Sequence, residues 1–312
     1  MGLGKGAGRH HLKTMTAEDA FDAYEAVRER LPKVRAGGAC REVDTLDDIA
    51  DEFDVLLLDA FGVLNIGETA IPGAVDRIAS LRTRGKRCIV VTNAAGYPHA
   101  LLMERYLRLG FDFAEDEVVS SRATLLSAVR SEPSRKWGIM ATEMFGLADL
   151  EALDVTFLAE DRAAYDASEA FLLLGSAAWT EERQRLLEAS LLKNPRPVWV
   201  GNPDIVAPRE TGFSVEPGFF AHRLADRTGI TPRFFGKPFE NIYDFAFRRL
   251  GGIADRTRVV MVGDSLHTDV LGAQTAGVAS ALISGHGFFC GSGVSAAIEA
   301  SGIRPDYIVR TT

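Results

Sequence analysis

Short apolar runs alternate with amphipathic helical patterns along most of this chain. The run at residues 55–58 (VLLL) is apolar at every position and stops at the carboxylate of Asp59. A run without polar alternation predicts a strand buried on both faces, as in a parallel sheet covered by helices. Similar runs predict further strands at 88–91, 118–119, 259–262 and 280–283. Helical patterns separate them at 74–84, 99–109, 242–250 and 269–276. The alternation predicts an α/β fold with a doubly wound, Rossmann-like parallel sheet.

A helical pattern also precedes the first apolar run. Thr16, followed three residues later by Asp19, resembles a capping box, which marks the start of a helix. Phe21, Tyr24 and Val27 then recur at helical spacing. We therefore expect residues 1–44 to form a glycine-rich tail over residues 1–15 and a helix that begins at Thr16.

The middle of the chain repeats the rhythm of strand and helix more loosely. Apolar runs (GIMA, VTFLA and AFLLLG), a long helical pattern from about Glu181 and the run PVWVGNPD suffice for a second small α/β domain. We expect this inserted domain at residues 122–213, within a core formed by residues 45–121 and 214–312. A length of 312 residues accommodates two domains, since a single domain typically holds roughly 100–200 residues.

Composition and charge narrow the choice of partners. The net charge of −8 argues against nucleic acid, because binding to a phosphate backbone needs clustered Lys and Arg. The three cysteines lack a CxxC spacing, and Cys88 lies in an apolar run where a buried thiol is expected. No apolar stretch reaches the roughly 18 residues of a membrane span, and the N-terminus lacks the apolar region of a signal peptide. We therefore expect a cytoplasmic protein that binds neither nucleic acid nor membrane.

Polar side chains stand just beyond the carboxyl ends of three predicted strands: Asp59, Thr92 with Asn93, and Asp264. In an open parallel sheet these ends line the crevice in which ligands bind. A single Asp at the end of a strand is often only a helix cap. The three strand ends together favour a binding site.

The segment GDSLHTD places Asp264 and Asp269 five residues apart, in a loop that enters a helix. Close to Asp59 they would form a cluster of carboxylates that repel one another unless a cation lies between them. Mg²⁺ fits such a site, because it takes oxygen ligands and keeps several waters and substrate phosphate oxygens. The alternative for Asp269 is a charge in the first turn of a helix, favoured there by the helix dipole.

Lys237 lies between Gly236 and Pro238, just ahead of a predicted helix. Pro restricts the backbone and suits the start of a helix, so the lysine is expected in a short, stiff loop. Its ammonium group can neutralise phosphate and a carboxylate nucleophile, as phosphoryl transfer requires. In isolation it would be an ordinary surface lysine, but beside the acidic strand ends it is a candidate catalytic residue.

In chain order, DAFGVL (59–64), VTNAA (91–95), GKP (236–238) and GDSLHTD (263–269) resemble the four motifs of the haloacid dehalogenase (HAD) superfamily. The insertion between the second and third motifs resembles the class IIA (C2) cap of its sugar, nucleotide, nitrophenyl and pyridoxal phosphate phosphatases. The GNPD segment at 201–204 and residues 216–238 also resemble the class IIA pattern. The resemblance covers about residues 45–312 and implies a HAD-like phosphoric monoester hydrolase whose cap selects the substrate.

The resemblance implies a role for each motif. Asp59 would be the nucleophile that forms an aspartyl-phosphate, which divides one difficult displacement into two easier ones. Thr92 and the amide of Asn93 would hold the phosphate, and Lys237 would neutralise its charge. Gly62 would permit the tight turn after the nucleophile.

The resemblance also implies Mg²⁺ as the cofactor. Its ligands would be Asp59, the backbone carbonyl of Phe61 and Asp264, with Asp269 as a further candidate.

Phe61 departs from the family pattern. Phosphatases of the superfamily usually carry a second Asp two residues after the nucleophile, which protonates the leaving oxygen and later activates water. Phe transfers no protons, and general acid–base help contributes on the order of 10²–10⁴ in rate. Either the substrate has a good leaving group, or another residue supplies the proton, with His267 as one candidate. Alternatively, the protein is a metal-free dehalogenase, since those enzymes carry an aromatic residue here, or a weakly active or non-catalytic binder of a phosphorylated ligand.

The resemblance implies a small phosphorylated metabolite, of the sugar or polyol phosphate kind, as substrate. Asn202 and Asp204 at the exit of the cap are candidates for contacts in the cleft, although Pro203 between them favours a structural turn equally. A homodimer formed through the cap is the oligomeric state that the resemblance implies.

Overall fold

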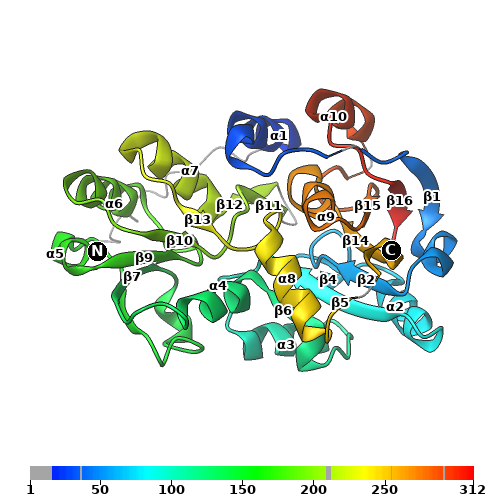
Figure 1. The fold of residues 1–312 in the computed structure, drawn as a ribbon, viewed down its shortest axis with the longest axis horizontal. Helices are drawn as coiled ribbons and strands as arrows, with labels where there is room; N and C mark the ends of the chain where they lie inside the picture. Colours follow the sequence, from blue (N-terminus) through cyan, green and yellow to red (C-terminus); the bar gives the residue numbers. More distant parts are fainter. Residues whose placement is uncertain (1–15, 36, 209–211, 254, 291) are drawn as a thin grey trace, which may run out of the picture.

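The computed structural model describes residues 16–35, 37–208, 212–253, 255–290 and 292–312, and the predicted tail at residues 1–15 lies outside this part of the chain. Two lobes lie side by side, each built around its own sheet (Figure 1). The larger lobe, the core, holds a seven-stranded sheet, and the smaller lobe, the cap, holds a five-stranded one.

The core sheet is parallel throughout. Its strands lie in the order β1-β16-β15-β14-β2-β5-β6, and every neighbouring pair is parallel. The strands are β1 (Arg41–Thr45), β2 (Val55–Leu58), β5 (Arg87–Thr92), β6 (Val118–Ser120), β14 (Val259–Gly263), β15 (Ala279–Ile283) and β16 (Tyr307–Thr311). The predicted doubly wound parallel sheet is confirmed. Every residue of β2 and β14 is buried, as their apolar runs predicted.

Helices cover both faces of the core sheet, because successive side chains of a strand point to opposite faces. Leu56 packs in an apolar cluster with α2 and α3, whereas its neighbour Leu57 packs on the other face with α8 and α9. The helices of the core are α1 (Ala17–Ala26), α2 (Ala74–Thr83), α3 (His99–Arg108), α8 (Glu240–Arg249), α9 (Leu271–Ala276) and α10 (Val294–Ser301). The helix α4 (Ser121–Val129) directly follows core strand β6 but packs its apolar side chains in a cluster with cap strands β7 and β9. The predicted helix at 269–276 differs in detail, since a π-helical turn, η7 (Leu266–Val270), precedes α9.

The N-terminal helix α1 begins as predicted. The Thr16 hydroxyl accepts from the amide of Asp19, and the Asp19 carboxylate accepts from the amide of Thr16. Ala20 and Tyr24 on the buried side of α1 pack in one apolar cluster with η7, α9 and α10. The helix is therefore part of the folded core.

The cap sheet is also parallel, in the order β13-β10-β9-β7-β8. Its strands are β7 (Lys136–Met140), β8 (Asp154–Phe157), β9 (Ala170–Leu173), β10 (Val198–Val200) and β13 (Arg233–Phe234). Its helices are α5 (Arg162–Ala167), α6 (Glu181–Lys193) and α7 (Pro217–Thr228).

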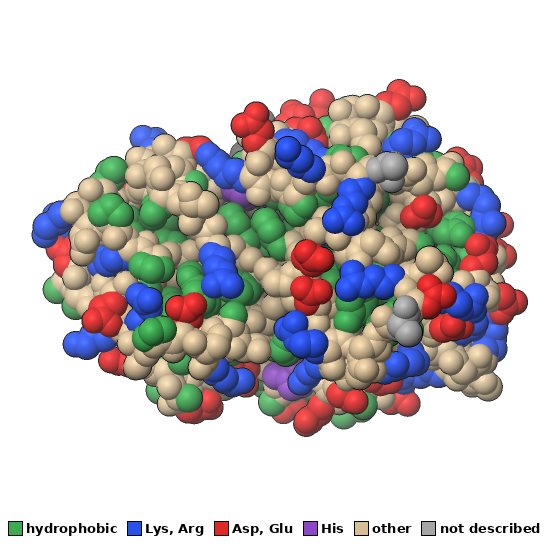
Figure 2. All heavy atoms as spheres, in the orientation of Figure 1, with side chains coloured by type: hydrophobic (Ala, Val, Ile, Leu, Met, Phe, Trp, Pro, Cys, Tyr) green, Lys and Arg blue, Asp and Glu red, His purple; other side chains and the backbone are tan. Residues whose placement is uncertain are grey.

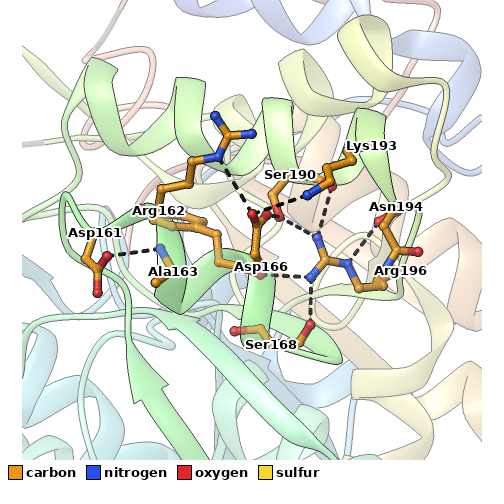
Figure 3. Close-up of polar contacts among 10 residues, drawn as sticks. Asp161, Arg162, Ala163, Asp166, Ser168, Ser190, Lys193, Asn194 and Arg196 are labelled. Atoms are coloured by element: carbon orange, nitrogen blue, oxygen red, sulfur yellow. Dashed lines mark hydrogen bonds and ion pairs between the residues drawn. The ribbon is translucent and has the colours of Figure 1, made fainter.

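Arg196 holds two cap helices together (Figure 3). Its guanidinium donates to the carbonyl oxygens of Tyr165 at 2.8 Å and Ser168 at 2.6 Å, at the end of α5. It also donates to the carbonyl oxygen of Ser190 in α6 at 3.0 Å and to the hydroxyl of the same residue at 2.5 Å. Hydrogen bonds from a charged donor are stronger than neutral ones. This contact therefore fixes α5 against α6.

The boundaries of the two lobes differ from the predicted ones. β13 pairs with β10, and α7 packs Phe220 and Leu224 into the apolar cluster of the cap. The inserted segment therefore extends to about residue 234 instead of 213. An amphipathic pattern shows that a helix has a buried face but does not tell which sheet it covers. At the other end, β1 pairs with β16, so the core includes residues from 41 instead of 45.

Two short antiparallel strand pairs and several 3₁₀ turns complete the description. The antiparallel pairs are β3 (Asn65–Ile66) with β4 (Thr69–Ala70), and β11 (Val206–Pro208) with β12 (Phe213–Val215). The 3₁₀ turns are η1 (Arg28–Arg30), η2 (Leu46–Asp48), η3 (Ala50–Glu52), η4 (Glu115–Glu117), η5 (Glu143–Phe145) and η6 (Arg256–Arg258).

Charged side chains of both signs are interspersed over the face shown in Figure 2, with no broad area of a single sign. None of the helices in the described ranges has the length and apolarity needed to cross a membrane.

Candidate active site

The carboxyl ends of the neighbouring strands β14, β2 and β5 meet at the junction of the two lobes. Asp264 follows β14, Asp59 follows β2, and Thr92 ends β5. A cavity of about 370 Å³ opens here between core and cap. Among the predicted site residues, those that line it are Asp59, Phe61, Thr92, Asn93, Asn202, Asp204, Lys237 and Asp264. The other two, Gly62 and Asp269, lie directly behind Asp264 and Lys237.

Lys237 links two of the carboxylates. Its Nζ lies 2.6 Å from Oδ1 of Asp59 and donates to Oδ1 of Asp269 at 2.7 Å. The lysine is only 1% exposed. Burial disfavours a charged amine, but Asp269 and Asp59 outweigh this effect and raise the pKa of Lys237 above its ordinary value. Lys237 is therefore a cation at neutral pH, as a group that neutralises phosphate must be.

Asp59, Asp264 and Asp269 form a cluster in which one carboxylate oxygen of each lies within 4.8 Å of the others. Burial raises the pKa of Asp59 to about 6, although Lys237 opposes the shift. Burial also raises the pKa of Asp264, and the neighbouring Asp59 and Asp269 add to the rise. A bound cation would relieve this repulsion, and converging carboxylate oxygens are the donors that Mg²⁺ prefers. The residues present therefore fit the predicted ion.

The two carboxylates of the GDSLHTD segment have different partners. Asp269 uses both oxygens, because Oδ1 accepts from Lys237 and Oδ2 accepts from the amide of Ser265 at 3.1 Å. Asp264 accepts at Oδ2 from the amide of Phe288 at 2.8 Å, and it lines the cavity. Asp264 is thus the better placed of the two to share an ion with Asp59, and Asp269 to hold Lys237.

Two glycines allow the backbone to approach Asp264 closely. Gly62 has a φ of 75°, and a Cβ there would lie 2.4 Å from Oδ2 of Asp264. Gly287 has a φ of 71°, and its Cβ would lie 1.8 Å from the same oxygen. Both positions therefore need glycine for conformation and for space.

Asn93 ties three segments of the site together. Its Oδ1 accepts from the amide of Lys237 at 2.8 Å, and its Nδ2 donates to the carbonyl of the same residue at 2.9 Å. The same Nδ2 donates to Oδ1 of Asp204 at 2.7 Å. Burial raises the pKa of Asp204 to about 8, against the opposite effect of Asn93. The hydroxyl of Thr92 accepts from the amide of Ala94 at 3.3 Å.

The GNPD segment combines both alternatives considered for it. Oδ1 of Asn202 accepts from the amide of Asp204 at 3.0 Å, which is an Asx turn. Both residues also line the cavity. Nδ2 of Asn202 donates to Glu216 at 3.2 Å, and Glu216 is a wall residue that the sequence did not indicate.

Phe61 lines the cavity where the family pattern has an acid. Arg105 of α3 lies over its ring, with Cζ 4.9 Å from the ring centroid, in a cation–π contact. Arg105 is buried and donates to the carbonyl of Gly67 at 2.6 Å and to Glu68 at 3.1 Å. Its Nη1 has no hydrogen-bond partner within the described part of the chain. The buried guanidinium of Arg105 thus packs against the Phe61 ring.

His267 does not replace the missing acid. It is buried, its Nε2 lies 2.5 Å from Oε1 of Glu25, and it is absent from the lining of the cavity. Burial lowers its pKa, although Glu25 acts in the opposite direction. The prediction that His267 supplies the proton is wrong, because its ring faces α1.

Tyr24 and Phe288 also line the cavity, and neither was predicted. Each reaches the site from a segment distant in sequence from the motifs. Tyr24 gave only a helical spacing signal, and the glycines at 285 and 287 were the only hint of a tight turn before Phe288. Such long-range contacts leave no local pattern.

Comparison with known proteins identifies the family of this site. A family model described as haloacid dehalogenase-like hydrolase matches residues 56–155, and a HAD-hydrolase-like model matches residues 234–311. The chain is 30% identical over 243 residues to D-glycerol 3-phosphate phosphatase of Mycobacterium tuberculosis, covering 76% of this chain and 65% of that protein's length. It is also 30% identical over 248 residues to glycerol-3-phosphate phosphatase of Rattus norvegicus, covering 72% of this chain and 76% of that protein.

Solved structures share the fold. A possible sugar phosphatase of Cytophaga hutchinsonii superposes with a TM-score of 0.76 at 23% identity, covering 87% of this chain and 98% of that one. A glycerol phosphate phosphatase of Mycobacterium tuberculosis in complex with magnesium has a TM-score of 0.67 at 26% identity, covering 83% of this chain and 75% of that one. The chain therefore belongs to the haloacid dehalogenase-like hydrolases, in their class IIA, capped branch.

Proposed function

We propose that this protein is a Mg²⁺-dependent phosphatase that hydrolyses a small phosphate monoester through an aspartyl-phosphate on Asp59. One observation carries the proposal. The carboxylate of Asp59 ends a buried strand, lies 2.6 Å from the ammonium of Lys237 and clusters with Asp264 in a cavity between core and cap. This is the arrangement that in-line attack on phosphorus requires: a nucleophile, a cation beside it and room for the substrate.

The chain's own residues would perform two displacements. A carboxylate oxygen of Asp59 attacks phosphorus, the ester P–O bond breaks, and the alcohol oxygen leaves. Water then attacks the same phosphorus, the bond to Asp59 breaks, and inorganic phosphate leaves with the carboxylate restored. Thr92 and Asn93 would bind the phosphoryl oxygens, and Lys237 would balance their charge. Since the side chain of Phe61 has no acidic proton to transfer, the leaving oxygen would take a proton from water.

Asp59, Asp264 and the Phe61 carbonyl would hold Mg²⁺. When bound, the ion would lower the repulsion between the phosphoryl group and the carboxylates. Asp269, with both oxygens already engaged, would hold Lys237 in position instead of binding the ion directly.

For the substrate we propose a sugar or polyol phosphate. The relatives named as glycerol phosphate phosphatases support this class. In the cavity wall, Asn202 and Asp204 from the cap exit provide the polar groups that a polyol would contact.

A second candidate, a metal-free dehalogenase, is favoured by one observation, the aromatic Phe61. The buried carboxylates Asp264 and Asp269 weigh against it, because without a cation they would repel an anionic haloacid.

Hydrolysis of p-nitrophenyl phosphate and glycerol 3-phosphate, with Mg²⁺ or with chelator, tests the proposal. We expect activity that chelator removes and that Asp59→Asn abolishes, while Asp112→Asn, on an exposed aspartate paired with Arg82, leaves it unchanged. Release of chloride from haloacids in the presence of chelator would instead establish the dehalogenase. Saturable phosphate binding without turnover of either ester would establish a binding protein.

A further inference from the structure

The helix α1 lies outside the segments that match the family models, which begin at residue 56. It nevertheless covers the junction of the lobes, between cap helix α7 and core helices α9 and α10 (Figure 1). Glu25 of α1 contacts His267 of η7 at 2.5 Å, and Phe21 contacts the same ring edge-on at 5.2 Å between centroids. The helix is therefore docked directly on the GDSLHTD segment.

Tyr24 of the same helix contacts His267 and also reaches the cavity. It is 3% exposed, and its ring stacks on His267 with centroids 5.0 Å apart and an interplanar angle of 9°. Its hydroxyl accepts a hydrogen bond from the amide of Ile205 at 3.2 Å. Tyr24 thus touches the core through its ring and the exit of the cap through its hydroxyl, and it lines the same cavity as Asp59 and Lys237.

The hydrogen-bonding capacity of this hydroxyl is only partly used. A tyrosine hydroxyl has one proton to donate and lone pairs that accept. The amide of Ile205 occupies the accepting side, so the proton stays available for an acceptor in the cavity. Burial, with Asp204 and Asp269 nearby, raises the pKa of Tyr24 above its ordinary value, so the group keeps its proton at neutral pH.

The position of the hydroxyl indicates which part of a ligand it meets. Ile205 follows Asp204, whose Oδ1 lies 2.7 Å from Nδ2 of Asn93. Asn93 in turn holds both backbone polar groups of Lys237. Tyr24 is therefore connected, through Ile205 and Asp204, to Asn93, one of the residues assigned above to the phosphoryl oxygens.

We infer that the Tyr24 hydroxyl donates a hydrogen bond to the phosphoryl group of the bound substrate, so that α1 supplies a substrate-binding residue from outside the matched family segments. The inference rests on the proposed function of the cavity. It adds a neutral donor to the ammonium of Lys237 and makes α1 a part of the active site.

Tyr24→Phe tests the inference, because it removes the hydroxyl and keeps the ring that stacks on His267. We expect kcat/KM for p-nitrophenyl phosphate with Mg²⁺ to fall by about 10-fold or more, the usual effect of losing a hydrogen bond to a charged group. The Kd of inorganic phosphate, measured by calorimetry with Mg²⁺, should rise by a similar factor. Circular dichroism should show an unchanged fold.

Two controls separate binding from docking. Tyr165→Phe removes a buried cap hydroxyl that donates to the carbonyl of Ala159 at 2.8 Å and should leave both readouts unchanged. Phe21→Leu loosens the contact of α1 with His267 without touching the hydroxyl and should change both by less than about twofold. An unchanged phosphate Kd in Tyr24→Phe, or an equal loss in Phe21→Leu, would overturn the inference.

The phosphate titration distinguishes this failure from a failure of the proposed function. A wild-type protein that hydrolyses no ester but binds phosphate more tightly than Tyr24→Phe would reject the phosphatase and support the role of Tyr24. Wild-type protein that binds no phosphate in the presence of Mg²⁺ would overturn the role of Tyr24 as well.

Discussion

The core and the cap are both built on parallel sheets, yet the residues directly at the ends of their strands differ in chemistry. In the core, Asp59 follows β2, Asp264 follows β14, and Thr92 ends β5. The cap strands β7, β9 and β10 are followed by Ala141, Leu174 and Gly201.

Strand geometry alone therefore does not make a site. In an open parallel sheet the carboxyl ends form a crevice whatever their sequence, and the side chains placed there decide whether it carries chemistry. Here the end of the core sheet supplies the clustered carboxylates. The end of the cap sheet supplies apolar wall such as Leu174 and, beyond β10, the polar side chains of Asn202 and Asp204. The comparison predicts that changes at the core strand ends alter turnover, whereas changes inside the cap and away from the cavity alter stability.

Asp264→Asn should have the largest effect. The variant keeps the shape of the side chain but loses a charge that the proposed ion needs. Metal ions contribute several kcal/mol to such transition states, so we expect a loss of about 10³-fold in kcat/KM for p-nitrophenyl phosphate. Calorimetry with Mg²⁺ should show weaker binding.

Asp269→Asn is the matched comparison within the same segment. Because both oxygens of Asp269 already have partners, its replacement should weaken Mg²⁺ binding much less while still lowering turnover through Lys237. Equal losses of Mg²⁺ affinity in the two variants would show that Asp269 binds the ion directly, as the sequence allowed.

Arg196→Met should have the next largest effect, on the stability of the cap. It removes four charge-assisted hydrogen bonds to Tyr165, Ser168 and Ser190 and leaves carbonyl groups without their donor. We expect urea unfolding to show a loss of about 2–3 kcal/mol, since these bonds are partly exposed and not additive. The kcat/KM of the folded protein should stay within about twofold.

Lys193→Met provides the control for Arg196→Met. Lys193 lies 3.6 Å from Asp166 in the same group of side chains (Figure 3), but it is largely exposed. Surface ion pairs contribute little, so the variant should lose less than about 1 kcal/mol. Equal destabilisation by both variants, or a fall in kcat/KM with Arg196→Met, would break the separation between cap stability and core chemistry.

The sequence predicted the centre of the fold well and its margins poorly. β2 and β14 are buried on both faces, so their apolar runs were unambiguous. β1 at the sheet edge is largely exposed, and β13 has only two residues, so neither left a comparable pattern. The predicted core boundary at residue 214 was wrong, because the apolar face of α7 does not tell which sheet the helix covers, and only its packing in the structure places it on the cap.

The same distinction holds for the site. Asp59, Thr92 and Asp264 were predictable because strand ends converge for a geometric reason that sequence alone reveals. Tyr24 and Glu216 were not predictable. Tyr24 lies on α1 and Glu216 is the N-terminal capping residue of α7, and the docking of both helices depends on tertiary packing. His267 was misjudged for the same reason, since its partner Glu25 lies 242 residues away.

His222 offers a smaller test on the cap side. It is buried in α7 and stacks on Phe234 with centroids 4.9 Å apart. Burial lowers its pKa from 6.5 to about 4, and Arg30 acts in the same direction. Below pH 6.5 His222 therefore binds a proton in the unfolded chain but stays neutral in the folded chain. The stability that is present above that pH is lost as the pH falls towards 4.

His222→Phe removes this titration while keeping an aromatic ring against Phe234. Between pH 7 and pH 5 the wild type should lose about 2 kcal/mol more in urea unfolding than the variant does. The pH profile of kcat should be the same for both proteins. Parallel losses of stability on acidification would show that His222 is not the responsible group.

Phe61→Asp should have the smallest effect, and it tests why this core end carries an aromatic residue. The new carboxyl could protonate the leaving oxygen, a help worth on the order of 10²–10⁴ in favourable sites. Here Arg105 lies over position 61, and its Nη1 has no hydrogen-bond partner among the residues described, so it would pair with the new Asp and lower its pKa. We therefore expect only about a 10-fold gain, below the range of such acids.

The gain should depend on the leaving group. Glycerol 3-phosphate loses a poor alkoxide and should benefit, whereas p-nitrophenyl phosphate loses a stable phenolate and should change by less than about twofold. Phe61→Asn, of the same shape without the proton, is the control and should give no gain with either ester. If Asn helps as much as Asp, the benefit comes from space or polarity at position 61. The site would then lack no proton donor, and the leaving oxygen would already receive its proton from elsewhere in the cavity.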